Sequence, residues 1–485
     1  MMHALRIHPT DDVAVAVEAV KKGEAVLGVT AREDIPAGHK LALRPIQAGE
    51  TVLKYGMPIG HATRPIAAGE WVHAHNLATS LSGELTYRYE PSPIPALAPF
   101  DGQFMGYLRA DGCVGVRNEL WIIPTVGCVN GAAQKLAERA KTELGVPACA
   151  LTHPYGCSQL GEDYANTQKL LCALVRHPNA GGVLVLGLGC ENNHLGVFRE
   201  ALGEVDPDRV RFLNAQDVPD EVEAGMTVLR ELAEIMRRDE RTPQPLDKLV
   251  LGLKCGGSDG YSGLTANPLL GALCDGVCAA GGSALLTEVP EMFGAETLLM
   301  ARCVNERVFE DTVNLINGFK RYFEAHHQPV YENPSPGNKA GGITTLEEKS
   351  LGCTQKGGVG PVCDVLAYAQ VHRTRGLSLV YGPGNDICAC TALAAAGAQL
   401  ILFTTGRGTP LGSPVPVLKV ATNHALAQKK QGWIDFDAES VLEEPMTQVA
   451  QCLLRLALET ASGRETCSER KGYRDLAIFK DGVTL

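Results

Sequence analysis

Short apolar runs alternate with amphipathic segments through most of the chain, from residue 105 to residue 485. In the first part of this stretch the apolar runs are Leu120–Ile123, Ala148–Leu151 and Val183–Leu188. In the second part they are Leu249–Leu253, Ser283–Val289, Leu377–Tyr381 and Leu400–Phe403. Such runs are typical of strands buried on both faces, and their alternation with helices predicts parallel sheets covered on both sides. We therefore predict two α/β domains, 105–245 and 246–485, with largely parallel sheets.

The first 90 residues have a different pattern, in which short strand-like runs are separated by turns. The turn Ile35-Pro36-Ala37-Gly38 recurs as Ile46-Gln47-Ala48-Gly49 and as Ile66-Ala67-Ala68-Gly69. Runs of this kind between glycine-containing turns predict a small β-rich domain, 1–90. Four prolines then fall between Pro91 and Pro99, which predicts a stiff, extended linker over 91–104.

Composition limits the classes of function. The formal net charge is −11, so we expect no basic surface for nucleic acid. No apolar run reaches the roughly 18 residues of a spanning helix, and the first residues lack the charged start and apolar core of a signal peptide. We therefore expect a cytoplasmic protein with no membrane or nucleic-acid partner, in which the 16 cysteines are mostly reduced thiols.

Nearly every predicted strand of the two α/β domains ends in a turn rich in glycine, cysteine or amide side chains. Because ligands bind at the carboxyl ends of strands in open α/β sheets, these turns together predict one polar site. They contain no P-loop, and Gly187-Leu188-Gly189 lacks the third glycine of a dinucleotide-binding fingerprint. Five cysteines lie in these turns or in the long segment described next, namely Cys128, Cys157, Cys190, Cys255 and Cys353. They are either small fillers of tight turns or thiolate ligands of iron or an iron–sulfur cluster, and their spacing does not decide between the two.

The segment from Tyr331 to Lys356 shows neither helical nor strand periodicity. A loop of this length inside a compact domain is usually functional or disordered, and the apolar side chains within it argue against disorder. Its lysines, amides and hydroxyls predict a polar surface that faces a ligand.

Three histidines are candidates for binding a metal. His73 and His75 flank Ala74, and residues i and i+2 of a strand share one face, so both imidazoles could bind one divalent ion. His39 follows a similar turn in the same domain.

Four cationic side chains are candidates for binding a carboxylate, namely Arg117, Arg407, Lys339 and Lys356. An arginine can hold a carboxylate through two parallel hydrogen bonds. The alternative for Arg117 is an ordinary salt bridge. Glycines and threonines surround Arg407 and would let the backbone approach a ligand, which favours the binding role there.

Several motifs together resemble the altronate and galactarate dehydratase family of sugar-acid dehydratases, over nearly the whole chain. These motifs are Gly38-His39-Lys40, Lys54-Tyr55-Gly56, Gly115–Glu119, Thr125–Asn130, the segment 331–356 and Thr405–Pro410. The first domain is similar to the small β domain known as SAF, whose relatives include the small subunit of a sulfolactate sulfo-lyase. His73-Ala74-His75-Asn76 and the C-terminal Leu476–Leu485 are most similar to the altronate branch.

The resemblance implies removal of water from D-altronate to give 2-dehydro-3-deoxy-D-gluconate in hexuronate catabolism, with dependence on divalent iron or manganese. Under this hypothesis the metal ligands are His39, His73, His75 and Glu191. The catalytic acid and base are drawn from Lys339, Lys356 and His39, and the substrate is bound by Arg117, Arg407, Asn338 and Thr405.

The sequence leaves three alternatives open. The substrate could instead be galactarate, or sulfolactate as in a sulfo-lyase. A non-catalytic protein that binds a sugar acid is the alternative outside the enzymes, because SAF-like domains also serve as binding modules. The expected partner is in each case a small acid, and assembly into a homo-oligomer stays open.

Overall fold

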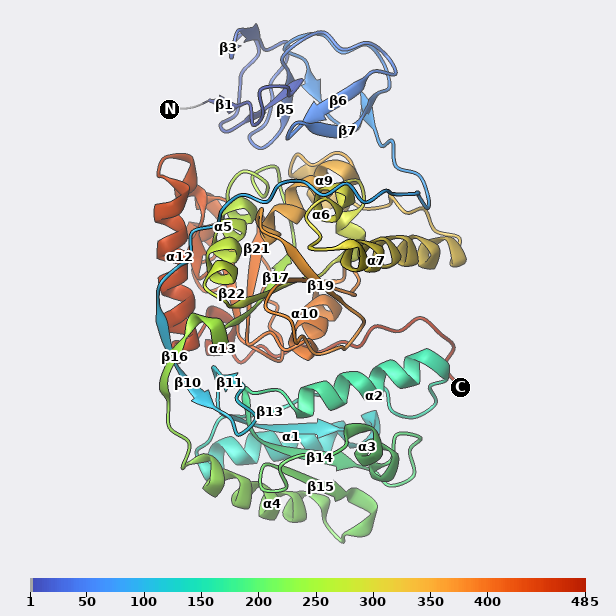
Figure 1. Ribbon diagram of the computed structural model, residues 1–485, viewed down its shortest axis with the longest axis vertical. Coiled ribbons are helices and arrows are strands. Elements are labelled where there is room, and N and C mark those ends of the chain that lie inside the picture. The colour runs from blue at the N-terminus through green and yellow to red at the C-terminus, as the bar shows by residue number, and fades with distance from the viewer. Residues whose placement is uncertain (1–2) are drawn as a thin grey trace.

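The computed structural model describes residues 3–485, which form three domains stacked along the long axis of the molecule (Figure 1). The first domain, at the top of Figure 1, lies on the third domain, and the second domain lies at the opposite end of the third. The order in space is therefore first, third, second, so that the last part of the sequence forms the centre of the molecule.

The first domain consists of short antiparallel strands, which confirms the predicted β-rich domain. Its larger sheet has the order β1-β2-β5-β8, and its smaller sheet has the order β6-β7-β9. The strands are β1 Ala4–Leu5, β2 Val13–Ala16, β3 Ala25–Val26, β4 Val29–Thr30, β5 Lys40–Ala42, β6 Thr51–Lys54, β7 Met57–Ala62, β8 Trp71–Val72 and β9 Leu77–Ala78. The recurring turns end at Gly38, Gly49 and Gly69, whose φ angles lie between +79° and +81°. The sequence repeat is thus a repeated left-handed turn, a conformation that glycine adopts without strain.

A two-residue turn joins β6 to β7 and points toward the third domain. Lys54 pairs with Met57, and the two residues between them, Tyr55 and Gly56, have φ angles of +63° and +73°. Positive φ at both central residues matches the twist of the flanking strands. The turn places the Tyr55 hydroxyl against the backbone of Gly263 in the third domain.

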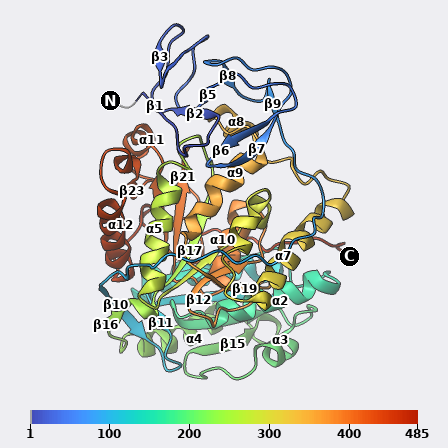
Figure 2. The same ribbon diagram turned by 45° about the horizontal axis from the view of Figure 1, so that its top comes forward.

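Residues 79–102 form an extended strap that crosses the third domain (Figures 1 and 2). Side chains and backbone both bind it there. The Tyr87 hydroxyl donates to the Glu296 carboxylate at 2.5 Å, and the Tyr89 hydroxyl donates to the Cys303 carbonyl at 2.9 Å. Further along, the Phe100 amide donates to the carbonyl of Gly276 at 3.0 Å. The predicted extended linker is therefore held against the third domain along its length.

The second domain contains a four-stranded parallel sheet of order β13-β12-β14-β15, as the buried apolar runs predict. The strands are β12 Glu119–Pro124, β13 Ala148–Ala150, β14 Ala180–Gly187 and β15 Val210–Asn214. Helices α1 (Asn130–Arg139) and α4 (Glu221–Met236) cover the face that carries Leu120 and Ile122. Helices α2 (Gly161–Val175) and α3 (Leu195–Leu202) cover the face that carries Trp121. A small sheet, β11 (Val114–Gly115), β10 (Gln103–Leu108) and β16 (Thr242–Pro245), joins the two ends of this domain.

The third domain contains a seven-stranded parallel sheet of order β19-β20-β18-β17-β21-β22-β23. The strands are β17 Val250–Cys255, β18 Ser283–Leu286, β19 Val362–Leu366, β20 Gly376–Val380, β21 Leu400–Thr405, β22 Val417–Ala421 and β23 Phe436–Asp437. Helices α5 (Ala266–Ala279) and α12 (Met446–Ala461) pack on one face, and α10 (Asp386–Ala395) packs on the other. Helix α7 (Glu306–Ala325) lies beside β19. The prediction of two α/β domains with parallel sheets is confirmed.

The strand order of the third domain reverses between β17 and β21. After β17 the chain builds one side of the sheet and then returns to place β21 on the other side of β17. Ligands bind at such a reversal, outside the carboxyl ends of the strands. Here that edge faces the first domain, since a Cβ on Gly260, in the loop after β17, would meet the carbonyl of Gly38.

The prediction of a structureless loop over 331–356 is wrong for most of its length. The segment contains α8 (Pro336–Ala340), α9 (Leu346–Cys353) and a 3-10 turn, Thr354–Gly357. All eight residues of α9 are buried, including Glu347, Glu348 and Lys349. A helix buried on every side among polar partners needs no apolar stripe, so the sequence lacked the period that would have revealed it.

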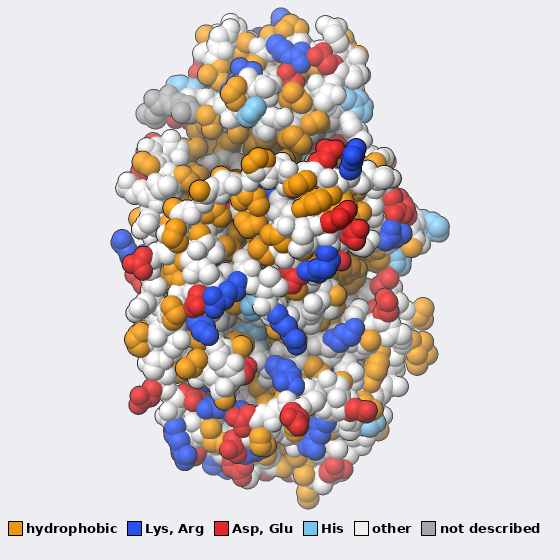
Figure 3. All heavy atoms as spheres, in the orientation of Figure 1, with side chains coloured by type: hydrophobic (Ala, Val, Ile, Leu, Met, Phe, Trp, Pro, Cys, Tyr) orange, Lys and Arg blue, Asp and Glu red, His pale blue; other side chains and the backbone are white. Residues whose placement is uncertain are grey.

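Charged side chains of both signs are mixed over the second domain, on the face that Figure 3 shows. On the same face hydrophobic side chains gather on the third domain, below the first. Within residues 3–485 no helix is both long enough and apolar enough to cross a membrane.

Candidate functional site

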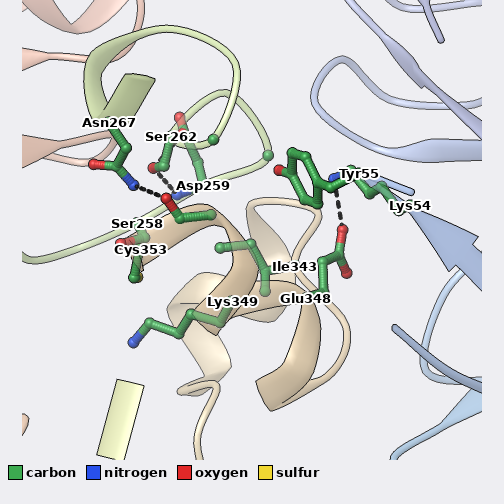
Figure 4. A pocket seen from close by; sticks show the side chains of 13 residues that line it. Lys54, Tyr55, Ser258, Asp259, Ser262, Asn267, Ile343, Glu348, Lys349 and Cys353 are labelled. Carbon is green, nitrogen blue, oxygen red and sulfur yellow. Dashed lines mark hydrogen bonds and ion pairs between the residues drawn. The ribbon is translucent and has the colours of Figure 1, made fainter. Parts of the chain in front are cut away.

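A narrow cavity lies where the first domain meets the carboxyl edge of the third-domain sheet (Figure 4). It is lined by the β6–β7 hairpin, the loop after β17, the start of α5, and helix α9 with the residue Ile343 before it. The lining residues are Lys54, Tyr55, Ser258, Asp259, Gly260, Ser262, Gly263, Asn267, Ile343, Glu348, Lys349, Gly352 and Cys353. Segments far apart in the sequence therefore meet in one narrow crevice whose lining residues are mostly of polar types.

The contact that closes this crevice is made backbone to backbone at Gly260. Its amide donates to the Gly341 carbonyl at 2.7 Å, and a Cβ at this position would lie 1.9 Å from the carbonyl oxygen of Gly38. We expect Gly260→Ala to lower the free energy of unfolding by about 1–3 kcal/mol, the usual cost of overpacking, and to loosen the first domain. Urea unfolding and limited proteolysis of the strap measure both effects. The matched control is Gly131→Ala, because a Cβ there meets nothing within 4 Å. Equal stability of the two variants would contradict the close contact.

Two buried lysines from the first domain share one carboxylate of α9. Lys40 Nζ lies 2.8 Å from one oxygen of Glu348, and Lys54 Nζ lies 2.8 Å from the other. Lys40 also donates to the Gly342 carbonyl at 2.8 Å and to the Thr344 hydroxyl at 2.9 Å. No side chain of this triad is more than 2% exposed, so the ion pairs form the buried joint between the first and third domains.

The pKa values of the three charged groups in this triad are shifted differently by burial and by their neighbours. Burial alone would raise the pKa of Glu348, but Lys40 and Lys54 outweigh it and lower that pKa to about 2. Burial lowers the pKa of Lys40 to about 8 against the attraction of Glu348, and the neighbouring Lys54 adds to the lowering. For Lys54, Glu348 and Tyr55 outweigh burial, so its pKa is raised. The carboxylate is therefore ionised, and Lys40 is the more weakly held proton of the two lysines.

A second buried centre lies at the carboxyl ends of β17 and β18. The Sγ atoms of Cys255 and Cys353 lie 3.3 Å apart, and Glu291 Oε2 lies 3.3 Å from the first and 3.2 Å from the second. Within residues 3–485 this is the one place where potential ligand atoms of three Cys, His, Asp or Glu residues lie within 4.8 Å of one another.

Three lysines surround this thiol and carboxylate centre. Lys356 Nζ lies 2.7 Å from Cys255 Sγ and 3.2 Å from Glu288, and Lys349 Nζ lies 2.7 Å from Glu291. Lys254 pairs with Glu288, and its Nζ lies 2.8 Å from Asp386. Two sulfurs and a carboxylate are donors that soft metals accept, but here ammonium groups already occupy the space beside them.

The lysines of this centre stay protonated at neutral pH. Burial would lower the pKa of Lys356, but Cys255 and Glu288 outweigh it and raise the pKa above its ordinary value. Burial would likewise raise the pKa of Glu291, but Lys349 and Lys254 hold it well below its ordinary range. Lys356 is thus an ammonium group at neutral pH, not a base.

The histidines lie around Trp71 at the edge of the first domain, but not on a strand. His73 and His75 fall in the turn between β8 and β9, so the prediction that they share a strand face is wrong. The turn forms because the His73 amide donates to the Asn76 side chain at 2.9 Å and the Asn76 amide donates back to the His73 carbonyl at 2.9 Å. His73 is half-buried, whereas His75 is exposed.

Trp71 nevertheless brings the three imidazoles together. The ring centroids of His39 and His73 lie 5.1 Å apart. The ring centroid of His75 lies 5.5 Å from that of Trp71. His73 Nδ1 lies 3.1 Å from the Thr344 hydroxyl, which places the cluster beside the start of α9. Burial lowers the pKa of His39, and burial with the Lys40 charge lowers that of His73 to about 4, so both rings are neutral at pH 7.

Four other predicted residues lie around the loops after β17 and β21. Asn338 is buried and donates to the Ser258 carbonyl at 2.8 Å, and Lys339 follows it in α8 with an exposed side chain. Thr405 is buried, and its hydroxyl accepts from the Gly408 amide at 2.8 Å. Arg407 donates to the Gly337 carbonyl at 3.3 Å. These residues form a rim next to the cavity, and the hydrogen bonds of Asn338 and Thr405 hold the loops of this rim in place.

Arg117 lies elsewhere and its guanidinium is already bound. It makes a two-pronged ion pair with Glu469, at 2.7 and 2.9 Å, and donates to the carbonyls of Thr460 and Arg464. It also donates to its neighbour Val116. The predicted carboxylate-binding role for Arg117 therefore finds no free donor, and the salt-bridge alternative describes it.

Glu191 is also separated from the histidines, since it follows β14 in the second domain at the far end of the molecule. Its carboxylate accepts from the Thr125 hydroxyl at 2.6 Å and from the amides of Leu188 and Gly189. These three donors hold its pKa below the ordinary value against the effect of burial. The prediction that Glu191 joins the three histidines as a metal ligand is wrong in this fold.

Several residues of the two buried centres escaped the sequence-based prediction of the site. They are Lys40, Lys54, Lys254, Asp259, Glu288, Glu291, Glu348 and Lys349. Lys40 and Lys54 stand in the motifs that carry the family resemblance, and Glu288 and Glu291 stand in a strand-end turn. Their place in these motifs and turns is the signal by which the sequence could have marked them as site residues. Nothing in the sequence tells which charged residue of a turn is buried.

Models of protein families match the chain in three consecutive segments. The model described as the altronate/galactarate dehydratase SAF domain matches residues 2–80. The second-domain model of D-galactarate dehydratase/altronate hydrolase matches residues 106–237, and the C-terminal model of D-galactarate/altronate dehydratase matches residues 246–484.

Characterised relatives cover the chain from end to end. It is 54% identical over 496 residues to the altronate dehydratase of Escherichia coli (strain K12), with 100% of both chains covered. It is 52% identical over 499 residues to the altronate dehydratase of Bacillus subtilis (strain 168), again with 100% of both covered. It is 33% identical to the galactarate dehydratase (L-threo-forming) of Escherichia coli (strain K12), over 98% of this chain and 96% of that protein.

Proposed function

Since this chain belongs to the altronate/galactarate dehydratase family, we propose that it is a hydro-lyase that removes water from D-altronate to give 2-dehydro-3-deoxy-D-gluconate. The observation that carries the assignment within the family is identity above 50% to two altronate dehydratases over the full length, against 33% to a galactarate dehydratase. We place the reaction at the closed crevice between the first and third domains, whose cavity of about 10 Å³ must open for a sugar acid to enter.

The reaction makes three demands on the crevice. The proton at C2 is weakly acidic because it lies beside a carboxylate that is already negative, so the enediolate needs positive charge around it. The hydroxyl at C3 needs a proton as it leaves, and the proton at C2 needs a base. General acid and base catalysis each contribute about 10²–10⁴-fold when the group is correctly placed.

The positive charge is supplied in part by lysines. The crevice holds Lys54 and Lys349 on its lining, with Lys40 bound to the same carboxylate as Lys54. All are buried, and a buried cation acts on a neighbouring anion with little screening by water. Arg407 and Lys339 on the rim suit the distal end of a bound sugar acid.

A divalent cation, iron or manganese, is part of this proposal, with the imidazoles of the first domain as its candidate ligands, although His39, His73 and His75 do not bring one ring nitrogen each within 4.8 Å of the others in this structure. His39 and His73 are neutral, which is the form that binds metals, and the Nδ1 atom of each is taken by Trp71 or Thr344. The Nε2 atom of His73 and a ring nitrogen of His75 are the donors that would hold the cation. His39 accepts the Trp71 indole N–H at Nδ1, so its Nε2 carries the ring proton, and His39 could bind the cation only after that hydrogen bond is broken. When bound it would supply Lewis-acid charge to the carboxylate and hydroxyl oxygens of the substrate.

The protonation states of the residues indicate which of them suit the acid and which suit the base. Lys356 remains an ammonium, so it suits the acid that protonates the departing hydroxyl. His39 is neutral and buried, but its one acceptor nitrogen, Nδ1, is bound by the Trp71 indole, so it could act as the base only after that hydrogen bond is broken, and Lys339 is the other candidate base.

Turnover of three acids tests the assignment. Purified protein with ferrous iron or manganese is offered altronate, galactarate or (2R)-sulfolactate, and the 2-keto product is measured as its semicarbazone. We expect the highest kcat/KM with altronate. Preference for galactarate or release of sulfite would move the protein to another branch, and tight binding of altronate without product would indicate a binding protein.

The metal assignment is tested separately with His73→Ala. We expect this variant to lose bound iron or manganese and to fall in kcat, because an imidazole ligand is gone. His61→Ala is the matched control, since His61 lies in the same domain and bonds Ser80 instead. Elemental analysis of anaerobically dialysed protein decides, and unchanged metal content in His73→Ala would remove the histidines from the metal site.

We also propose a cytoplasmic location and a small sugar acid as the partner. The 16 cysteines are all free thiols in the structure, which supports a reducing compartment.

A further inference from the structure

Three loops at one edge of the second-domain sheet each contain a glycine followed directly by a cysteine. The pairs are Gly127-Cys128 after β12, Gly156-Cys157 after β13 and Gly189-Cys190 after β14. These strands are neighbours in a parallel sheet, so their carboxyl ends lie side by side. This edge belongs to the far end of the molecule from the cavity between the first and third domains (Figure 1).

Hydrogen bonds lock the three loops into one rim. The Gly127 amide donates to the Tyr155 carbonyl at 2.9 Å, which ties the first loop to the second. The Asn193 amide donates to the Gly156 carbonyl at 3.0 Å, which ties the second to the third. The Thr125 hydroxyl donates to Glu191 at 2.6 Å, which ties the first loop to the third. Glu191 therefore acts in this rim and fixes the turn that carries Cys190.

Glycine permits this packing, and at Gly156 any side chain would clash with the neighbouring loop. Gly156 has a φ of +100°, and a Cβ there would lie 1.9 Å from the carbonyl oxygen of Thr125. A Cβ on Gly127 would lie 3.0 Å from the carbonyl oxygen of His153. The loops thus approach one another backbone to backbone.

The rim presents thiols and unpaired polar atoms. Cys128, Cys157 and Cys190 are all exposed free thiols, and Gln216 donates to Cys190 Sγ at 3.5 Å. Two side-chain oxygens without a hydrogen-bond partner are buried near this edge, on Asn130 at the start of α1 and on Asn214 at the end of β15.

We propose that Cys128, Cys157 and Cys190 hold an iron–sulfur cluster. A single four-coordinate ion keeps its sulfur ligands about 3.8 Å apart, given metal–sulfur bonds of about 2.3 Å. At least one pair of these three sulfurs is more than 4.8 Å apart, since they do not form a compact group of ligand atoms. A polynuclear cluster holds its thiolate ligands further apart than a single ion does. Each thiol would lose its proton on binding iron, and three thiolates would leave one iron of a cubane open to an oxygen ligand.

Anaerobic reconstitution of the full chain with an iron salt, sulfide and a thiol reductant tests the proposal. We expect acid-labile sulfide, iron and visible charge-transfer absorbance to stay with the desalted protein. Cys128→Ser, Cys157→Ser and Cys190→Ser should each lose the labile sulfide, with alanine at the same positions as second variants if a serine form does not fold. Cys113→Ser and Cys452→Ser are the controls, because both thiols are exposed elsewhere and should change nothing.

Three outcomes would overturn the proposal. They are labile sulfide retained by the triple serine variant, iron bound without sulfide, and loss of sulfide on Cys255→Ser in place of the three rim variants. None of these readouts uses dehydration activity, so failure here and failure of the dehydratase assignment are distinguishable.

Discussion

Replacing Glu348 by glutamine lowers the free energy of unfolding by about 3–5 kcal/mol, the cost of breaking a buried ion pair by removing one partner. The substitution keeps the size of the side chain but removes the charge that Lys40 and Lys54 share. Two ammonium groups then face each other at the joint of two domains without a counter-ion. Because glutamine has nearly the same shape as glutamate, the packing stays intact, and the loss of stability measures the effect of the charge alone.

Urea unfolding measures this effect, and Glu310→Gln on the exposed side of α7 is the matched control. Surface substitutions of this kind usually change stability by less than about 0.5 kcal/mol. Pairing Glu348→Gln with Lys40→Met should recover part of the loss, since one unpaired charge is removed. A Glu348→Gln protein as stable as the Glu310→Gln control would show that the triad does not hold the first domain in place.

Replacing Lys356 by methionine lowers kcat by about 10²–10⁴-fold, the usual contribution of a placed general acid. Methionine matches the lysine stem but carries no proton for the departing hydroxyl. The fold should survive, because Glu288 keeps its partner Lys254. Steady-state kinetics with altronate and a urea unfolding curve separate the loss of activity from loss of structure.

Two controls sharpen this result. Lys169→Met changes an exposed lysine on α2 in the second domain and should leave kcat unaltered. Lys339→Met tests the other predicted lysine, whose exposed place on the rim suits binding, so KM should rise more than kcat falls. If Lys339→Met lost kcat and Lys356→Met did not, the roles of the two lysines would be exchanged.

The sequence was sufficient to predict the architecture because the relevant signals are local. Apolar runs such as Leu120–Ile123 are typical of strands buried between two layers of helices, and their alternation with helical segments favours parallel strands. The repeated turns of the first domain need glycine at Gly38, Gly49 and Gly69, and that pattern is visible in any reading of the chain.

The site was harder to predict because its signals are not local. His73 and His75 obey strand spacing in the sequence, yet the Asn76 side chain captures the His73 amide and bends the chain into a turn. Arg117 carries the charge of a binding residue, but its partner Glu469 lies more than three hundred positions later. Glu191 is suited to bind metal by type, and only its place in the second domain separates it from the histidines.

The strap of residues 79–102 has a consequence for how the enzyme could be divided. Within residues 3–485, no strand of the first domain joins a sheet of the other two. The strap tethers it covalently, and the buried triad and hydrogen bonds such as those from Tyr261 to the Val17 carbonyl and from Thr345 to the Ile59 carbonyl hold it in place. A covalent tether gives the docked module a high effective concentration, and a single cut in the strap removes that advantage. Two fragments, 1–80 and 103–485, would then reassemble as a bimolecular complex whose specific activity rises with protein concentration.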